Sequence, residues 1–129
     1  MPQDQASGAA ANKWGRETAR QIAPKIGAVM LTRNSNEAIL DGKRVTIRCA
    51  ARATRKVGVI FKMLETLEAV IGAFQLDDGS FEVWSLPPEV FRAQMKPTRS
   101  RKASRGRVHL VRRSVFSSRG TFIGRIRID

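Results

Sequence analysis

Apolar and polar residues alternate along residues 45–50, which read VTIRCA. A period of two is typical of a β-strand that buries one face and turns the other toward polar surroundings. The apolar residues 37–40 precede this strand, and Asp41 and Gly42, a common hairpin pair, lie between the two segments. The pattern therefore predicts a β-hairpin over residues 37–50.

Three other segments carry the signals of helices. Residues 60–67 have apolar side chains at the spacing of an amphipathic helix. Asn12 can cap a helix that begins at residue 13 and ends between residues 23 and 26. The prolines at positions 87 and 88 suit the first turn of a third helix, over residues 87–95.

The remaining strands are predicted by short apolar or alternating runs, over residues 28–32, 69–76, 81–86, 108–112 and 121–127. Residues 51–56 are basic and show no regular period. Helices that interrupt strands in this order are typical of an α/β or α+β domain. We therefore expect a central mixed β-sheet flanked by helices.

The chain of 129 residues is long enough for one domain, and 42% hydrophobic residues suffice for a packed core. Residues 1–11 are small and polar, so we expect a flexible N-terminal segment there and a single domain over residues 12–129. No apolar run has the length of a membrane-spanning helix, and the first residues lack the apolar core of a signal peptide. These features predict a cytoplasmic protein. The single cysteine, Cys49, excludes an intramolecular disulfide framework and a zinc site built from several cysteines.

Positive charge is concentrated near the C-terminus. The formal net charge is +13, of which residues 1–91 carry +2 and residues 92–129 carry +11. The basic segment 96–107 holds six cations in twelve residues. Binding to phosphates releases condensed counterions, which makes nucleic acid the favoured partner of such a segment. A solvated basic loop and an anionic membrane surface are the alternatives, and no long amphipathic helix accompanies the charge to support the membrane.

The cations expected to contact a sugar–phosphate backbone lie on the hairpin, directly after it, and in the C-terminal third of the chain. Contacts of this kind position a protein on nucleic acid without specifying a base sequence. They are Arg48, Arg52, Arg55, Lys56, Lys96, Arg99, Arg101, Lys102, Arg105, Arg107, Arg112 and Arg113.

The predicted hairpin begins with an acidic residue, Glu37, and its second arm carries the triplet Thr46, Ile47 and Arg48. This arrangement resembles the metal-binding hairpin of the restriction-endonuclease-like, or PD-(D/E)xK, nuclease superfamily. The resemblance implies that an acid on one strand and an acid-x-lysine triplet on the next hold Mg²⁺ and activate water. The order of elements over residues 13–127 is similar to that of such domains, so a restriction-endonuclease-like fold is implied as well.

Two residues depart from the pattern of that superfamily. Thr46 places a neutral hydroxyl where the second acid is expected, which removes one negative metal ligand. Arg48 stands at the lysine position, and an arginine side chain stays protonated and cannot shuttle a proton, whereas its planar guanidinium suits a phosphate. The triplet is therefore better fitted to hold a phosphate than to cleave one.

An active nuclease on this scaffold would need its other groups from nearby positions. Glu37 and Asp41 would hold the metal ion, Mg²⁺ in the first instance. Lys62 and Glu65, three residues apart on the next predicted helix, would replace the missing catalytic groups, although an exposed ion pair is their ordinary interpretation. Together with Arg48, these four residues are the candidate catalytic residues.

Three functions are compatible with the sequence. The favoured one is a protein that binds nucleic acid, DNA in preference to RNA, on a restriction-endonuclease-like scaffold with a weakened or lost metal site. The second is an active Mg²⁺-dependent endonuclease that hydrolyses DNA phosphodiesters, and the third is a small basic RNA-associated or interaction protein. In the favoured case the polar edge of the hairpin faces the sugar–phosphate chain, and the cationic C-terminal part holds the chain there. Many such scaffolds pair into homodimers.

Overall fold

A long helix opens the chain. The computed structural model describes the backbone of residues 5–32, 35–97 and 108–128, and their side chains except those of residues 5–12 and 61. Helix α1 (Gln5–Ile26) begins well before residue 13, because several of the residues before Asn12 are alanines, the strongest helix formers. It ends at Gly27, whose φ of 82° is the left-handed conformation that favours glycine after a helix.

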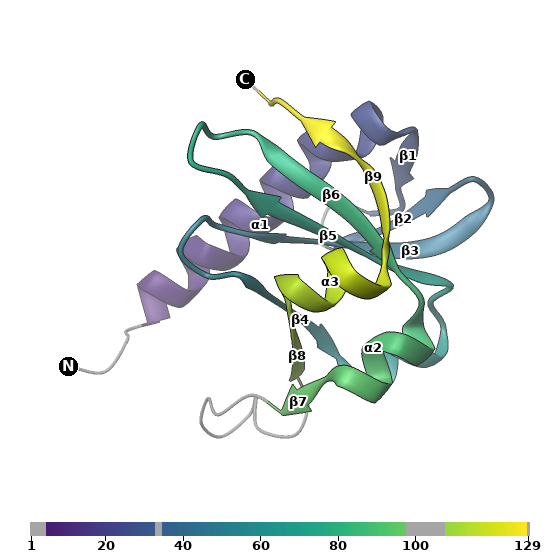
Figure 1. The fold of residues 1–129 in the computed structure, drawn as a ribbon. Helices are drawn as coiled ribbons and strands as arrows, with labels where there is room; N and C mark the ends of the chain where they lie inside the picture. The colour runs from purple at the N-terminus through teal and green to yellow at the C-terminus, as the bar shows by residue number, and fades with distance from the viewer. Residues whose placement is uncertain (1–4, 33–34, 98–107, 129) are drawn as a thin grey trace.

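Six strands form the main sheet, in the spatial order β1-β2-β3-β5-β6-β9. Strands β3 and β5 are parallel and the other neighbours are antiparallel, so the sheet is mixed, as predicted. Figure 1 shows α1 behind this sheet and the short C-terminal helix in front of it. The strands are β1 (Ala28–Met30), β2 (Glu37–Leu40), β3 (Lys43–Ala50), β5 (Ala69–Gln75), β6 (Phe81–Leu86) and β9 (Thr121–Ile126).

The predicted hairpin is present. Strands β2 and β3 pair antiparallel, with Glu37 opposite Thr46 and Leu40 opposite Lys43. The connecting residues Asp41 and Gly42 have φ values of 53° and 76°, the positive pair that a two-residue type I′ turn requires.

A second, smaller sheet has the order β4-β8-β7 and consists of β4 (Lys56–Ile60), β8 (Val108–Arg112) and β7 (Lys96–Pro97). The prediction of a helix over 60–67 was wrong, because β4 continues to Ile60 and only the 3₁₀ helix η1 (Phe61–Glu65) follows. The alternating burial of Val57 and Val59 identifies β4 as a strand, with Gly58 fitting closely against Leu110 and Val108 of β8. The apolar residues that follow β4 therefore lie in η1 and in the short segment after it, and not in an α-helix.

Two short helices complete the described chain. Helix α2 (Pro88–Gln94) begins with proline in its first turn, as predicted. Helix α3 (Arg113–Arg119) was not predicted, because seven residues are too few to show a helical period. Its buried Phe116 lies so close to Gly72 of β5 that any larger residue there would clash with it.

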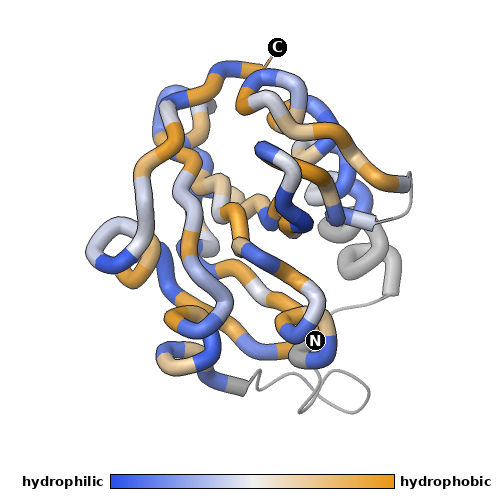
Figure 2. Tube along the Cα trace, turned by 90° about the vertical axis from the view of Figure 1, so that its right-hand side faces the viewer, coloured by the Kyte–Doolittle hydropathy of each residue, from blue (hydrophilic) through white to orange (hydrophobic). Residues whose placement is uncertain are grey.

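The core is divided between the two faces of the main sheet. Along β5, Ile71 and Ala73 pack with α1, whereas Val70 and Phe74 pack with the small sheet and the short helices. Figure 2 shows hydrophobic and hydrophilic residues following one another along the strands. A single α+β domain results, and none of its described helices is long and apolar enough to cross a membrane.

Candidate nucleic-acid interface

The acid at the start of the hairpin is bound within the hairpin itself. Arg44 donates from Nε and Nη2 to Oε2 of Glu37, at 2.8 and 2.5 Å. The backbone N–H of Arg44 donates to the Glu68 carboxylate at 2.8 Å, a contact that the sequence did not suggest. The Glu37 carboxylate is thus engaged with a cation of the neighbouring strand.

The two candidate metal ligands are separated along the hairpin. Asp41 lies in the turn, four residues from Glu37, and a strand rise of about 3.3 Å per residue places their backbones roughly 13 Å apart. Carboxylates that share one Mg²⁺ must approach it within about 2.1 Å. In the described part of the chain, no group of three or more His, Cys, Asp or Glu side chains is arranged to hold a metal ion.

Thr46 and Arg48, the polar positions of the second hairpin arm, do not form an exposed polar face as expected, because Thr46 is buried and Arg48 is partly buried. Thr46 is completely buried, and its hydroxyl donates to the Asn36 carbonyl at 3.4 Å. Burial lowers the pKa of Arg48, an effect that the neighbouring Cys49 partly opposes. The reason is that β3 is an interior strand with packed elements on both faces, so its alternating pattern marks two cores rather than a core and solvent.

Lys62 and Glu65 lie together on η1 and are exposed. With three residues per turn of a 3₁₀ helix, they share one side of it. Glu65 lines a hollow of about 490 Å³ together with Glu68, Glu89 and Arg92. Because η1 packs against β4 and α2, these two residues belong to the small-sheet side of the molecule.

Five other predicted cations lie close together, where β4 begins and β8 ends. Lys56 is directly opposite Arg112 in the antiparallel ladder, and the N–H of Arg113 donates to the Arg55 carbonyl at 2.8 Å. Arg52 precedes them in the turn after β3. We call Arg52, Arg55, Lys56, Arg112 and Arg113 the basic surface.

Two adjacent hollows lie in the basic surface, and both include Arg55 and Arg113 in their walls. The smaller one, of about 120 Å³, also includes Arg52 and residues at the end of β5. The larger one, of about 510 Å³, is lined by Arg55, Lys56, Arg112, Arg113, Ser114 and Ser117.

Only part of this positive charge is neutralised by described carboxylates. Arg113 forms an ion pair with Glu82 of β6 through both Nε and Nη2. Arg52 donates to the Asp77 carbonyl at 3.0 Å. For Lys56, as for Arg55 and Arg112, the described residues supply no ion-pair partner.

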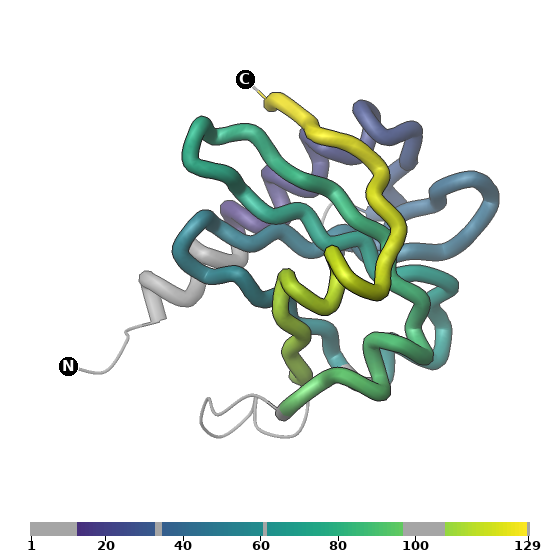
Figure 3. Tube along the Cα trace, in the orientation of Figure 1, coloured from purple at the N-terminus to yellow at the C-terminus, as the bar shows by residue number. Residues whose placement is uncertain are grey.

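The basic surface and the hairpin turn lie at opposite ends of β3. This strand has eight residues and therefore spans roughly 23 Å. Figure 3 shows the turn after β2 on one side of the molecule and the turn after β3 on the other. The candidate metal ligand Asp41 and the cation Arg52 are accordingly far apart.

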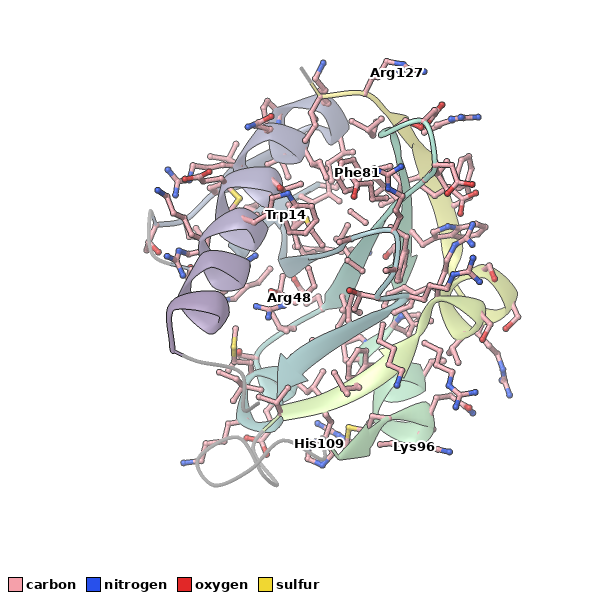
Figure 4. All side chains as sticks on the ribbon, turned by 90° about the vertical axis from the view of Figure 1, so that its left-hand side faces the viewer. Trp14, Arg48, Phe81, Lys96, His109 and Arg127 are labelled. Carbon is pink, nitrogen blue, oxygen red and sulfur yellow. The ribbon has the colours of Figure 1, made fainter. Side chains whose placement is uncertain are left out.

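Lys96 lies on β7, opposite Leu110 of β8, and Figure 4 shows it near His109 at the edge of the molecule farthest from Arg127. It therefore belongs to the same small sheet as Lys56 and Arg112. The other cations of the predicted basic segment lie outside the described residues: Arg99, Arg101, Lys102, Arg105 and Arg107.

Sequence reasoning missed Ser114 and Ser117, which line the larger hollow, and Glu82, which pairs with Arg113. The two serines lie on the helix that was not predicted, and Glu82 is far from Arg113 in the sequence. No protein-family model matches the chain, and no curated protein matches it either. Its function is therefore inferred from the arrangement of its own residues.

Proposed function

We propose that this protein binds nucleic acid, DNA in preference to RNA, through the basic surface. One observation carries the proposal: cations from two distant segments, residues 52–56 and 112–113, converge on two adjacent hollows while most of them have no described carboxylate partner. Such a surface attracts a polyanion, because each neutralised phosphate releases condensed counterions.

The small sheet carries one more described cation, Lys96, on its strand β7. Lys96 lies opposite Leu110 of β8, two residues before Arg112, and the remaining cations of the basic segment 96–107 lie between β7 and β8 in the sequence. The five-residue β8 is roughly 13 Å long, a distance that spans about four phosphates of one DNA strand along the helix axis. The cations of this sheet can therefore contact more than one phosphate of a nucleic-acid backbone.

Several features favour binding over metal-dependent cleavage. Glu37 is paired with Arg44, Asp41 lies about four strand positions away, and Thr46 is buried without a negative charge. A restriction-endonuclease-like scaffold with a lost metal site is part of the proposal, and the preference for DNA rests on that likeness.

The salt dependence of DNA binding tests the proposal. We expect the logarithm of the association constant for a fluorescent 20-base-pair duplex to fall linearly with the logarithm of the salt concentration, as measured by anisotropy. The double variant Lys56→Gln/Arg112→Gln should lower the steepness of that line by about 2. Affinity that does not change with salt, or a double variant that binds like the unmodified protein, would overturn the proposal.

A matched control is Lys25→Gln, which removes one positive charge from the exposed last turn of α1. Figure 1 shows this end of α1 on the side of the molecule away from β4 and β8. The control should retain the slope of the unmodified protein.

Incubation of supercoiled plasmid with the protein and Mg²⁺ or Mn²⁺ tests the alternative of a nuclease. We expect the plasmid to remain intact. Cleavage that disappears in Glu37→Ala would replace binding with catalysis as the function of the fold.

A further inference from the structure

Only cationic and hydroxyl-bearing side chains line the larger hollow of the basic surface. Four of its six lining residues are cations, from β4, the preceding turn, the end of β8 and the start of α3, and the other two are serines. Neither a carboxylate nor an apolar side chain is among the residues that line it. Guanidinium and ammonium groups with hydroxyls are the donors that bind the oxygens of a phosphate.

The backbone holds these cations together against their mutual repulsion. Lys56 and Arg112 are directly opposite in the ladder, where like charges destabilise a pair of strands. Arg55 has a φ of 58°, a left-handed conformation that is strained for a residue with a side chain. The hydrogen bond from the Arg113 N–H to the Arg55 carbonyl fixes this geometry. A bound anion would relieve the repulsion.

The charge in the hollow fits a dianion better than a monoanion. Arg113 is paired with Glu82, whereas Arg55, Lys56 and Arg112 have no ion-pair partner among the described residues. An internal phosphodiester carries one negative charge, whereas a phosphomonoester carries about 1.5 to 2 at neutral pH and three acceptor oxygens.

One of the two serines supplies a neutral donor at the same place. The Ser117 hydroxyl donates to the Ser114 carbonyl at 3.1 Å. The Ser114 hydroxyl is exposed and forms no hydrogen bond with the described residues, so it is free to donate to an anion.

We infer that this hollow is a site for a phosphomonoester, which it takes as the terminal phosphate of a nucleic-acid strand. The inference rests on the proposed nucleic-acid binding for its source of phosphate. The protein would then hold strand ends that carry a phosphate more tightly than ends that carry a hydroxyl.

Binding of three otherwise identical duplexes, with 5′-phosphate, 3′-phosphate or only hydroxyl ends, tests the inference. We expect one phosphorylated duplex to bind about tenfold more tightly than the hydroxyl duplex, the gain of one charge-assisted contact. Arg112→Gln should reduce that preference to less than about twofold, and Ser114→Ala should reduce it without changing the net charge. Lys25→Gln should retain it.

The outcomes separate the site from the wider function. Equal binding of all three duplexes would overturn the terminal-phosphate site and leave nucleic-acid binding in place. Persistence of the preference in Arg112→Gln, in a variant whose melting temperature shows that it is folded, would also overturn the site. If no duplex binds but inorganic phosphate raises the melting temperature of the unmodified protein and not of Arg112→Gln, the oxyanion site stands and the proposed function fails.

Discussion

Arginines at two places in the molecule have opposite surroundings. At the turn between β5 and β6, Arg125 and Arg127 bind Asp78 Oδ2 at 2.5 and 3.2 Å. Arg125 also donates to the Ser80 hydroxyl, and Ser80 donates to Asp78 through its N–H and its hydroxyl. In the basic surface, by contrast, Lys56 and Arg112 face each other with no described carboxylate between them.

The comparison distinguishes cations that form ion pairs within the fold from cations that are available to bind an external anion. The Asp78 cluster connects the edge strand β9 to a turn of the main sheet, and both of its arginines form ion pairs with the one Asp78 carboxylate. The basic surface leaves its charge open to solvent, where it can bind an external anion. Both regions contribute equally to the positive excess of residues 92–129, so the net charge alone does not distinguish them.

Removal of the buried Phe116 side chain, which packs α3 onto the main sheet, should have the largest effect on stability. Phe116 is fully buried and packs edge-on against Phe74, with ring centroids 5.2 Å apart. Phe116→Ala should lower the free energy of unfolding by about 3–5 kcal/mol, measured by urea denaturation. Because α3 carries Arg113 and Ser114, binding to DNA should weaken as well. Phe122→Ala, at a residue 52% exposed, is the control that should cost much less, and equal losses would contradict this role of α3.

Cys49 reports whether this segment of β3, which precedes the basic surface, is packed in the interior on its α1 side. Burial raises the pKa of the Cys49 thiol to about 12, despite the opposing effect of Arg48. We expect iodoacetamide at pH 8 to alkylate the folded protein at least about 100-fold more slowly than the urea-unfolded protein, since only the thiolate reacts. Similar rates in the two states would place this segment of β3 at the surface.

Glu82→Gln should increase the difference between the basic surface and the Asp78 cluster, because it leaves one more cation of the basic surface without a carboxylate partner. The variant breaks the ion pair with Arg113, which adds an uncompensated charge to the basic surface. We expect DNA affinity at low salt to rise by up to about fivefold, as for roughly one additional phosphate contact. The unfolding free energy should fall by about 1 kcal/mol or less. A decrease in affinity would show that the pair orients Arg113 for binding.

The contribution of the Asp78 cluster to stability should decrease in acid. The hydrogen bonds from Ser80, followed by those from Arg125, hold the pKa of Asp78 well below its usual range. A lower pKa in the folded state adds stability above the unfolded pKa of about 4, and this contribution is lost as the pH falls below that value. We expect the melting temperature to fall between pH 5 and pH 2.5 by less in Asp78→Asn than in the unmodified protein. DNA binding at pH 7 should be unchanged in that variant, and identical acid profiles would contradict the cluster's role.

Local patterns in the sequence were sufficient for most elements of the fold. The hairpin turn at Asp41 and Gly42, the strands of the main sheet and the helix that begins at Pro88 follow from short-range signals. Strand β4 and helix α3 were missed because each is short and gains its stability from packing, of Val57 and Val59 in one and of Phe116 in the other. The sequence identified the candidate cations individually, but it did not predict which of them lie together in the basic surface.

The sequence by itself determined an α+β domain with a mixed sheet, an excess of positive charge near the C-terminus, and a hairpin around Gly42. Only the tertiary structure decided which charges are available. It buried Thr46 by placing β3 inside the sheet, paired Arg125 with Asp78, and left Lys56 beside Arg112. The physical reason is that period and turn chemistry act over a few residues, whereas burial and charge compensation depend on partners that are distant in the chain.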